Sequence, residues 1–283
     1  MNSAIALRLA IVVAVGVVYP GLAPIALAQT AESTAAGQLD GKPDSYPDAS
    51  STGVPAGMAL SKQNGTIEIT TDGAVLEGID LVGNVVISAR DVTIRKSRIN
   101  SGTAYHLIRV MDGSTGFRLE DSELIGNGTT TNGVLGPGTF LRNNIHGFEN
   151  GLAIWGPSHI EGNFIHDLQG GPDAHFDTIE CNGGSDIAVI GNTLVNEFGQ
   201  TAVLMLNNQF AALQNWVVEG NRLIGGGYTM YIDYRKSSLP VGNIRISNNR
   251  WSSGQYGYTA FYGYVPDEWS GNVDDATGAP ISP

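Results

Sequence analysis

The chain has 283 residues and a formal net charge of −12 at pH 7, and only 15% of its residues are charged while 38 are Gly. This composition argues against a mainly helical protein, because the solvated faces of helices need abundant Lys, Arg and Glu. The acidic balance argues against nucleic acid or anionic membranes as general partners, since both carry negative charge. Frequent Gly and Asn beside Val, Ile, Leu and Thr instead favour many short strands joined by tight turns.

The first 28 residues have the features of a secretory signal peptide. Arg8 supplies a positive charge, and residues 9–18 form an apolar run that is too short to cross a bilayer as a helix. Ala-Leu-Ala at 26–28 forms a small-x-small cleavage site. We therefore expect cleavage after Ala28 and a secreted or periplasmic protein with no stable membrane insertion. An uncleaved anchor is the alternative, which two prolines within the apolar stretch disfavour.

Residues 29–50 are rich in Ala, Asp, Gly, Ser and Pro and show no apolar periodicity, which is typical of a flexible linker. No second shift in composition follows, so residues 51–283 are predicted to form one domain. Cys181 is the only cysteine, so no intrachain disulfide can form, and its neighbours predict a buried thiol. The oligomeric state is left open.

A loose internal repeat runs through this domain. Each copy has an apolar residue, two polar or small residues, Ser or Asn, any residue and a second apolar residue. The Ser/Asn positions recur at intervals of 20 to 29 residues. Such unequal intervals fit a parallel β-helix, whose strands stack in register while insertions leave as loops at the side. The repeat positions are Ser97, Ser122, Asn143, Asn163, Asn192, Asn221, Asn249 and a degenerate copy at Asn272.

The repeated Asn supplies a physical reason for the stack. An Asn at the same turn of every coil can hydrogen-bond the Asn above and below it at strand spacing, about 4.8 Å. We therefore interpret these Asn residues as structural. His146 and His166 each follow the Asn of their coil by three residues, so the two rings are predicted to stack.

The domain also resembles a known group of proteins. The resemblance rests on the segments VPAGMALSKQNGTIEITTDGAVLEGIDLVGNVVISARDVTIRKSRI, FIHDLQGGPDAHFDTIECNGGSDIAVIGNTL and GNRLIGGGYTMYIDY. They are similar to bacterial secreted right-handed parallel β-helix proteins of the pectate-lyase-like superfold, over roughly residues 50–275. The resemblance implies an all-β, single-stranded right-handed solenoid. Members of that superfold are lyases, hydrolases, epimerases, tailspikes or adhesins, so the resemblance does not specify the reaction.

The densest group of titratable residues is DAHFDTIE at 173–180, after a Gly-Gly-Pro turn. His175 and Asp177 are expected to form an orienting hydrogen bond that leaves the imidazole as acid or base. For hydrolysis, Asp177 and Glu180 form the one attractive carboxyl pair. Alternatively, Asp173, Asp177 and Glu180 bind Ca²⁺ through carboxylate oxygens, or Asp and His only cap the strand. The catalytic candidates are thus His175, Asp177 and Glu180, and the cofactor is either none or Ca²⁺.

Aligning the second strand of each coil gives a predicted register. It sets residues 150–154 beside 177–181, and 177–181 beside 201–205. Glu180 then points outward next to Leu204, while its two neighbours in the strand face the core. Side chains near this strand are candidates for sugar contact, because Arg clamps carboxylates and aromatic rings pack on apolar faces. The binding candidates are Arg109, Trp155, Tyr231, Tyr234 and Arg235.

These residues lead to the expectation of a carbohydrate-active protein whose partner is a polysaccharide. A lyase acting on a uronic-acid polymer needs a base, for which His175, Tyr231 and Lys236 are candidates. It also needs a group that neutralises the uronate, such as Arg109, Arg235 or Ca²⁺. A hydrolase needs the two carboxyl groups instead. The rival hypothesis is a non-catalytic surface or glycan-binding module. The only basic cluster, at residues 90–98, is either a polyanion site or a solvated face.

Overall fold

The computed structural model describes residues 45–101 and 105–283, so the expected signal peptide and most of the expected linker lie outside the described residues. The described residues belong to one compact unit, Pro43–Pro283. Within these ranges, no helix is both long and apolar enough to span a membrane.

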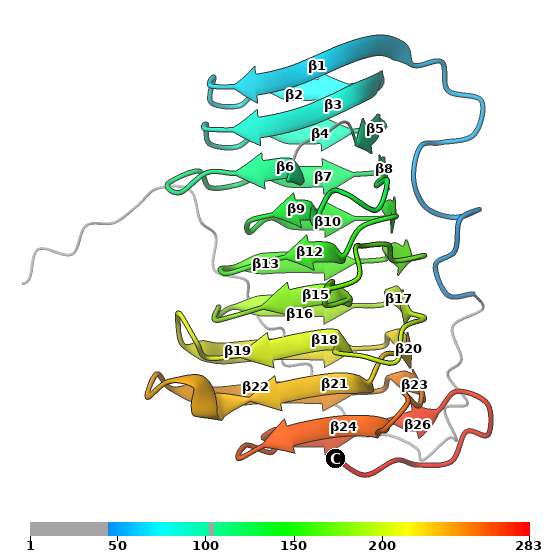
Figure 1. Cartoon of the computed structure of the whole chain (residues 1–283), viewed down its shortest axis with the longest axis vertical. Coiled ribbons are helices and arrows are strands. Elements are labelled where there is room, and N and C mark those ends of the chain that lie inside the picture. The colour runs from blue at the N-terminus through cyan, green and yellow to red at the C-terminus, as the bar shows by residue number, and fades with distance from the viewer. Residues whose placement is uncertain (1–44, 102–104) are drawn as a thin grey trace, which may run out of the picture. The chain divides into compact units, whose positions relative to one another are not determined.

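The unit is built from two parallel sheets (Figure 1). Sheet B has nine strands, and sheet A has seventeen. Sheet B comprises β2 (Val75–Glu77), β4 (Thr93–Arg95), β7 (Arg118–Glu120), β10 (Thr139–Leu141), β13 (Ser158–Glu161), β16 (Ile187–Ile190), β19 (Leu213–Glu219), β22 (Val241–Ser247) and β25 (Glu268–Ser270).

Sheet A begins with the long strands β1 (Ser61–Ile69) and β3 (Ile79–Ile87), and each later coil adds two shorter strands to it, except the last coil, which adds one. The first strands are β5 (Arg98–Ser101), β8 (Glu123–Ile125), β11 (Asn144–His146), β14 (Phe164–His166), β17 (Thr193–Asn196), β20 (Arg222–Gly225), β23 (Arg250–Ser252) and β26 (Val273–Asp274). The second strands are β6 (His106–Val110), β9 (Asn132–Leu135), β12 (Asn150–Ala153), β15 (Asp177–Cys181), β18 (Ala202–Asn207), β21 (Tyr228–Asp233) and β24 (Gly257–Tyr262).

Every coil repeats the same path, from a strand of sheet B through a tight turn to a first and then a second strand of sheet A. Each strand pairs in parallel with the equivalent strand of the next coil, as β12 does with β15 and β15 with β18. The predicted right-handed parallel β-helix is thereby confirmed. The one described helix is the short 3₁₀ turn η1 (Tyr234–Lys236).

The predicted Asn ladder is present at the turn between sheets B and A. The Asn143 side-chain amide donates to Asn163 Oδ1 at 2.9 Å, and the backbone N–H of Asn143 donates to the same oxygen at 2.9 Å. The same pair of bonds joins each Asn to the next coil as far as Asn272. All ladder side chains are buried. The amide satisfies backbone groups that would otherwise be unpaired in the interior, which explains why the same residue type recurs.

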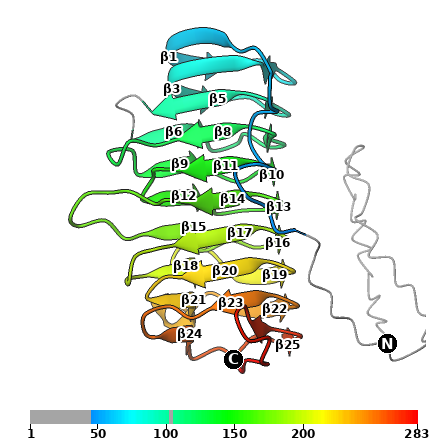
Figure 2. The ribbon, with the colours of Figure 1, turned by 90° about the vertical axis from the view of Figure 1, so that its right-hand side faces the viewer.

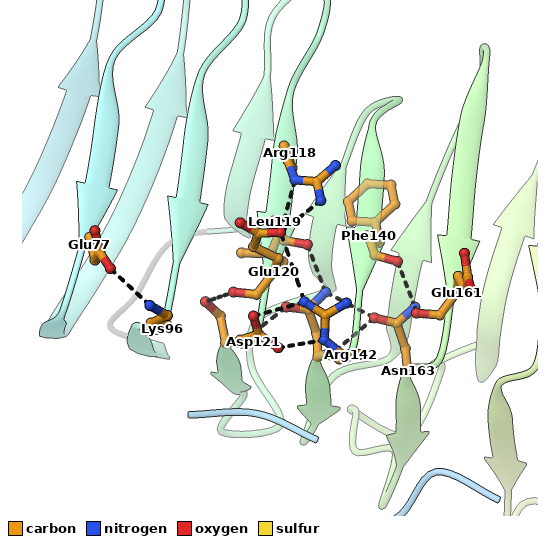
Figure 3. A network of polar contacts seen from close by, with 12 residues as sticks. Glu77, Lys96, Arg118, Leu119, Glu120, Asp121, Phe140, Arg142, Glu161 and Asn163 are labelled. Atoms are coloured by element: carbon orange, nitrogen blue, oxygen red, sulfur yellow. Dashed lines mark hydrogen bonds and ion pairs between the residues drawn. The ribbon is translucent and has the colours of Figure 1, made fainter. Parts of the chain in front are cut away.

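The residue before each ladder position has a left-handed backbone. Gly occupies this place in several coils, but Lys96, Asp121 and Arg142 adopt φ values of 47°, 48° and 53°. Their side chains form ion pairs between coils: Lys96 contacts Glu77 at 3.3 Å, and Arg142 contacts Asp121 at 2.7 Å (Figure 3). The other basic residues of the cluster at 90–98 are also paired with acids: Arg90 with Asp72, Arg95 with Glu77, and Arg98 with Glu123.

Burial alternates along the strands as the sequence predicts. Ile179 and Cys181 are fully buried in the core, whereas Glu180 between them is half-buried on the outer side. Burial raises the pKa of the Cys181 thiol to about 12, so the thiol is a structural group and no nucleophile at neutral pH. The predicted His146–His166 stack is also present, with ring centroids 5.2 Å apart.

Residues 45–60 run along the first strands of sheet A before β1 begins (Figure 2). The Gly53 N–H donates to the carbonyl of Arg142 at 2.9 Å. Nearer the start of this segment, the Tyr46 phenol lies in the field of Arg222, Arg250 and Asp275, and burial raises its pKa. The segment therefore contacts coils that lie far from β1 in the stack.

Candidate functional site

The outer side of the second strands, here called the second-strand face, carries three of the predicted residues, Arg109, Glu180 and Tyr231. Position by position, Ala153 pairs with Glu180, Glu180 with Met205, and Met205 with Tyr231. The sequence alignment had set Leu204 beside Glu180, and this was wrong by one residue, because Leu204 pairs with Ile179 in the core.

The error in register has a local cause. Thr201 adopts a left-handed backbone with φ of 49°, and its hydroxyl donates to the carbonyl oxygens of Phe176 and Gln200. Strand β18 therefore starts at Ala202, which pairs with Asp177. A non-Gly residue in this conformation is uncommon and was not foreseen from an apolar–polar pattern.

Asp177 lies at the start of β15 and is only 2% exposed. Its Oδ1 accepts the backbone N–H of Ala202 at 2.9 Å. Burial raises the pKa of this carboxyl well above its usual value, and the nearby Glu180 and Glu149 carboxylates raise it further. Asp177 is therefore a buried acid that retains its proton into a higher pH range than an exposed Asp.

Asn150 is the partner of Asp177 in β12 and is 5% exposed. Its side-chain N–H groups donate to Asn132 Oδ1 at 3.1 Å and to Glu180 Oε2 at 3.0 Å. These two acceptors fix the orientation of the amide. Its Oδ1 has no hydrogen-bond partner although it is buried. An unpaired buried carbonyl is costly and rare, so it marks this position as unlike the satisfied Asn ladder.

Glu180 is held in place by amides on both sides. Besides the bond from Asn150, its Oε1 accepts the side-chain N–H of Asn182 at 2.7 Å. Its carboxylate therefore has a defined position on the second-strand face while remaining partly accessible to solvent.

Glu149 is a third carboxylate of this cluster, which the sequence analysis missed. It directly precedes Asn150, and its Oε1 accepts the backbone N–H of His175 at 2.8 Å. It also lines a cavity of about 410 Å³ together with Gly128–Thr131 and Gly170–Ala174. The predicted pairing of residues 150 and 177 could have revealed Glu149, because it placed this residue one position before the strand.

His175 does not make the expected hydrogen bond to Asp177. Its side chain is exposed, and its ring has no hydrogen-bond partner among the described residues. Phe176 lies between the two in the chain and is buried against Phe198, with ring centroids 3.7 Å apart. Strand β15 begins at Asp177, whose carboxyl accepts the Ala202 N–H, whereas His175 lies in the loop before the strand with its side chain at the surface.

Asp173 is also exposed, on the cavity wall. In the part of the chain that the structure describes, no three His, Cys, Asp or Glu side chains form a group that could hold a metal ion. The calcium site of Asp173, Asp177 and Glu180 therefore stays a prediction.

Trp155 follows β12 and is 38% exposed. Its ring reaches back over the preceding coil, because a Cβ added at Gly136 would lie 3.3 Å from Trp155 Cη2. Gly136 also has φ of 131°, so both the close approach and the backbone require Gly there. The indole is thus a supported aromatic surface beside the Glu180 coil.

The remaining binding candidates gather around η1 and the end of β21. Asp233 is buried, and its carboxylate contacts Arg235 at 2.8 Å, which lowers the pKa of Asp233. The Arg235 guanidinium also lies over the Tyr262 ring, 4.3 Å from its centroid. Tyr231 packs against Tyr262 with ring centroids 5.0 Å apart, and Tyr234 is 42% exposed. Tyr262 was not predicted from the sequence.

Arg109 lies far from the cluster. The register runs from Arg109 through Leu135 and Ala153 to Glu180, which is three strand spacings, or about 14 Å. The guanidinium is exposed and has no acidic partner among the described residues.

Comparison with known proteins identifies no relative: no family model, no curated protein and no solved structure matches the chain.

Proposed function

We propose that the protein is a secreted carbohydrate-active enzyme that cleaves an extracellular polysaccharide, with hydrolysis as its reaction. The observation that carries the proposal is the carboxyl cluster of Glu149, Asp177 and Glu180, in which the middle group is buried and has a raised pKa. Two carboxyl groups with different protonation states are what glycoside hydrolysis requires. The sequence resemblance to the pectate-lyase-like superfold supports the same substrate class.

In this proposal Asp177, whose pKa is raised, is the proton donor and Glu180 is its partner. Because Asp177 is only 2% exposed, it would donate to the glycosidic oxygen once substrate binding opens its cover. Glu180, oriented by the amides of Asn150 and Asn182, would accept a proton from the attacking water or attack the sugar itself. Trp155, Tyr231, Tyr234 and Arg235 would contact neighbouring sugars along the stack.

Elimination by a lyase is less well supported. Of the three candidate bases, His175 has no orienting partner for its ring in the described structure, Lys236 lies 3.8 Å from the Asp233 carboxylate, and burial raises the pKa of Tyr231. Arg109 lies about three strand spacings from Glu180, and Arg235 is already paired with Asp233. A lyase needs its base and its neutralising cation around one sugar.

A glycan-binding module is the second candidate, and the exposed Trp155 and Tyr234 rings favour it. One experiment separates the three hypotheses. The purified protein is incubated with a panel of neutral, amino-sugar and uronic-acid polysaccharides, and new reducing ends and unsaturated, ultraviolet-absorbing products are measured. Reducing ends without unsaturation support hydrolysis, unsaturated products support a lyase, and binding without products supports the module.

Variants connect the products to the cluster. Glu180→Gln and Asp177→Asn should each lower the rate by about 100-fold or more, because each removes a proton-transfer group. Glu219→Gln is the matched control, since Glu219 is an exposed carboxylate at the end of β19 in sheet B. Full activity in both cluster variants would contradict the assignment.

A further inference from the structure

The second-strand face near Glu180 contains carboxyl groups but no available cation. Among residues 45–101 and 105–283, the Lys and Arg side chains without an acidic partner are Lys62, Arg109 and Arg245. Lys62 lies in β1 at the end of the stack, and Arg245 lies in sheet B. Arg109 is on the second-strand face, but three strands before Glu180.

The nearest cations on the other side are already neutralised. Arg235 donates two hydrogen bonds to Asp233, at 2.8 and 3.1 Å, and Lys236 Nζ lies 3.8 Å from the same carboxylate. An acidic sugar bound at Glu180 would therefore face Glu180 and Glu149 without a compensating charge. Like charges at such a site disfavour binding.

The groups that do face this region accept hydrogen bonds. The cavity beside the cluster is lined by the carboxylates of Glu149 and Asp173 and by Thr129–Thr131. On the face itself, the half-buried Glu180 carboxylate accepts hydrogen bonds from Asn150 and Asn182. Ionised carboxylates accept hydrogen bonds and cannot donate them, so they favour ligand N–H and O–H groups.

We infer that the sugar bound at Glu180 carries hydrogen-bond donors and no acidic group, so that the substrate is a neutral or amino-sugar polysaccharide and not a polyuronate. The inference rests on the proposed function, whose site it uses. It replaces the uronic-acid polymer expected from the sequence, for which Arg109, Arg235 or Ca²⁺ was to neutralise the uronate. Arg109 lies three strands away, Arg235 is paired with Asp233, and the described His, Cys, Asp and Glu side chains form no group that could hold a metal ion. Sugar hydroxyl groups and ammonium groups both donate hydrogen bonds, so the same acceptors can bind a neutral sugar or an amino sugar.

The test measures binding and cleavage separately. The protein is titrated calorimetrically, at low and high salt, with cello-, xylo- and manno-oligosaccharides, with chitosan oligosaccharides, and with oligogalacturonates and oligoalginates. We expect at least one neutral or amino-sugar series to bind at least about tenfold more tightly than either uronate series at low salt. Added salt should weaken binding of the chitosan series and leave neutral series unchanged, which distinguishes the two sources of donors.

Each outcome has a defined meaning. Uronates that bind as tightly as the other series overturn the inference, even if they are cleaved and the proposed function holds. A neutral or amino-sugar series that binds without being cleaved supports the inference and contradicts the enzymatic proposal. Absence of binding in every series overturns both. Glu149→Gln should reduce the difference in affinity between the uronate series and the other series. Glu219→Gln, in sheet B and away from this face, should leave that difference unchanged.

Discussion

Two stacks of polar side chains run through this solenoid, and they differ in how completely their groups are paired. In the turn ladder, Asn163, Asn192 and Asn221 repeat one arrangement in which each amide satisfies its neighbours. In the second-strand stack, successive coils place His106, Asn132, Asn150 and Asp177 at equivalent positions, and burial raises the pKa of the Asp177 carboxyl. Asn150 in this stack retains an unpartnered oxygen.

The difference separates stabilising from functional polar groups. Both stacks are buried, so burial alone does not distinguish them. A repeated and fully paired arrangement lowers the free energy of the fold, whereas an unpaired acceptor beside a buried acid costs free energy that packing elsewhere must offset. Substitutions in the two stacks should therefore change the stability of the protein in opposite directions.

The largest effect is expected from Asn192→Ala in the turn ladder. This change removes an amide that donates to the carbonyls of Ile160 and Ile190 and to Asn221 Oδ1. We expect a loss of roughly 3–5 kcal/mol in the free energy of unfolding, because several buried groups lose their partners at once.

Urea unfolding measures this loss, and Asn84→Ala is the control. Asn84 accepts one bond from Thr66 on the exposed β1–β3 pair and should cost about 0.5 kcal/mol or less. Equal losses in the two variants would show that the ladder is not special.

A smaller effect of opposite sign is expected from Asp177→Asn in the second-strand stack. The new amide can still accept from Ala202, and it can donate to the unpartnered Oδ1 of Asn150. We expect a gain of about 1–2 kcal/mol in the free energy of unfolding at pH 7, together with the loss of activity stated above.

The pH dependence of this gain has a definite sign. Burial raises the folded-state pKa of Asp177, so the wild-type protein keeps the associated stability below the unfolded pKa of about 4 and loses it as pH rises through the folded pKa. The advantage of Asp177→Asn should therefore widen from pH 3 to pH 7. An advantage that narrows with rising pH would show that the carboxyl is charged in the folded protein.

Trp155→Ala tests the face beside the second stack. The indole lies over Gly136 and offers an aromatic surface to the polymer. Its removal should weaken oligosaccharide affinity by about tenfold, or ~1.4 kcal/mol, with little change in stability. Trp155→Phe should retain most of the affinity in the same titration, and equal losses in both variants would indicate that the ring does not stack on sugar.

The smallest effect is expected from Arg142→Gly at the turn before the ladder. Gly relieves the left-handed backbone, but the change also removes the exposed ion pair with Asp121. These contributions should cancel within about 0.5 kcal/mol. The reverse change, Gly162→Arg, gains no such pair and should cost about 1 kcal/mol in urea unfolding.

The repeat could be predicted from the sequence because the ladder requires the same amide at the same turn of each coil. Ser97 and Ser122 fit this rule less well, since a hydroxyl provides only part of the amide's bonds. The charged residues Lys96, Asp121 and Arg142 were harder to interpret, because their pairing depends on the neighbouring coil.

The site could be located but not assembled from the sequence. The segment 173–180 does contain Asp177 and Glu180. However, the left-handed backbone of Thr201 changes the register of the next strand, and Glu149 of the preceding coil is also part of the cluster. Which side chain is buried, as Asp177 is and His175 is not, depends on how loops cover the strand. The alternation of inward and outward side chains along a strand does not tell which of them a neighbouring loop buries.

The segment of residues 45–60 has a consequence for how the solenoid unfolds. In a simple repeat stack each coil contacts only its neighbours, so coils can fray one after another from an end. Here Gly53 is bonded to the coil of Arg142, and Tyr46 lies near Arg222 and Asp275, close to the last coils. Loss of the terminal coils would therefore also release the segment that leads into β1. This long-range connection makes unfolding more cooperative than nearest-neighbour stacking alone allows.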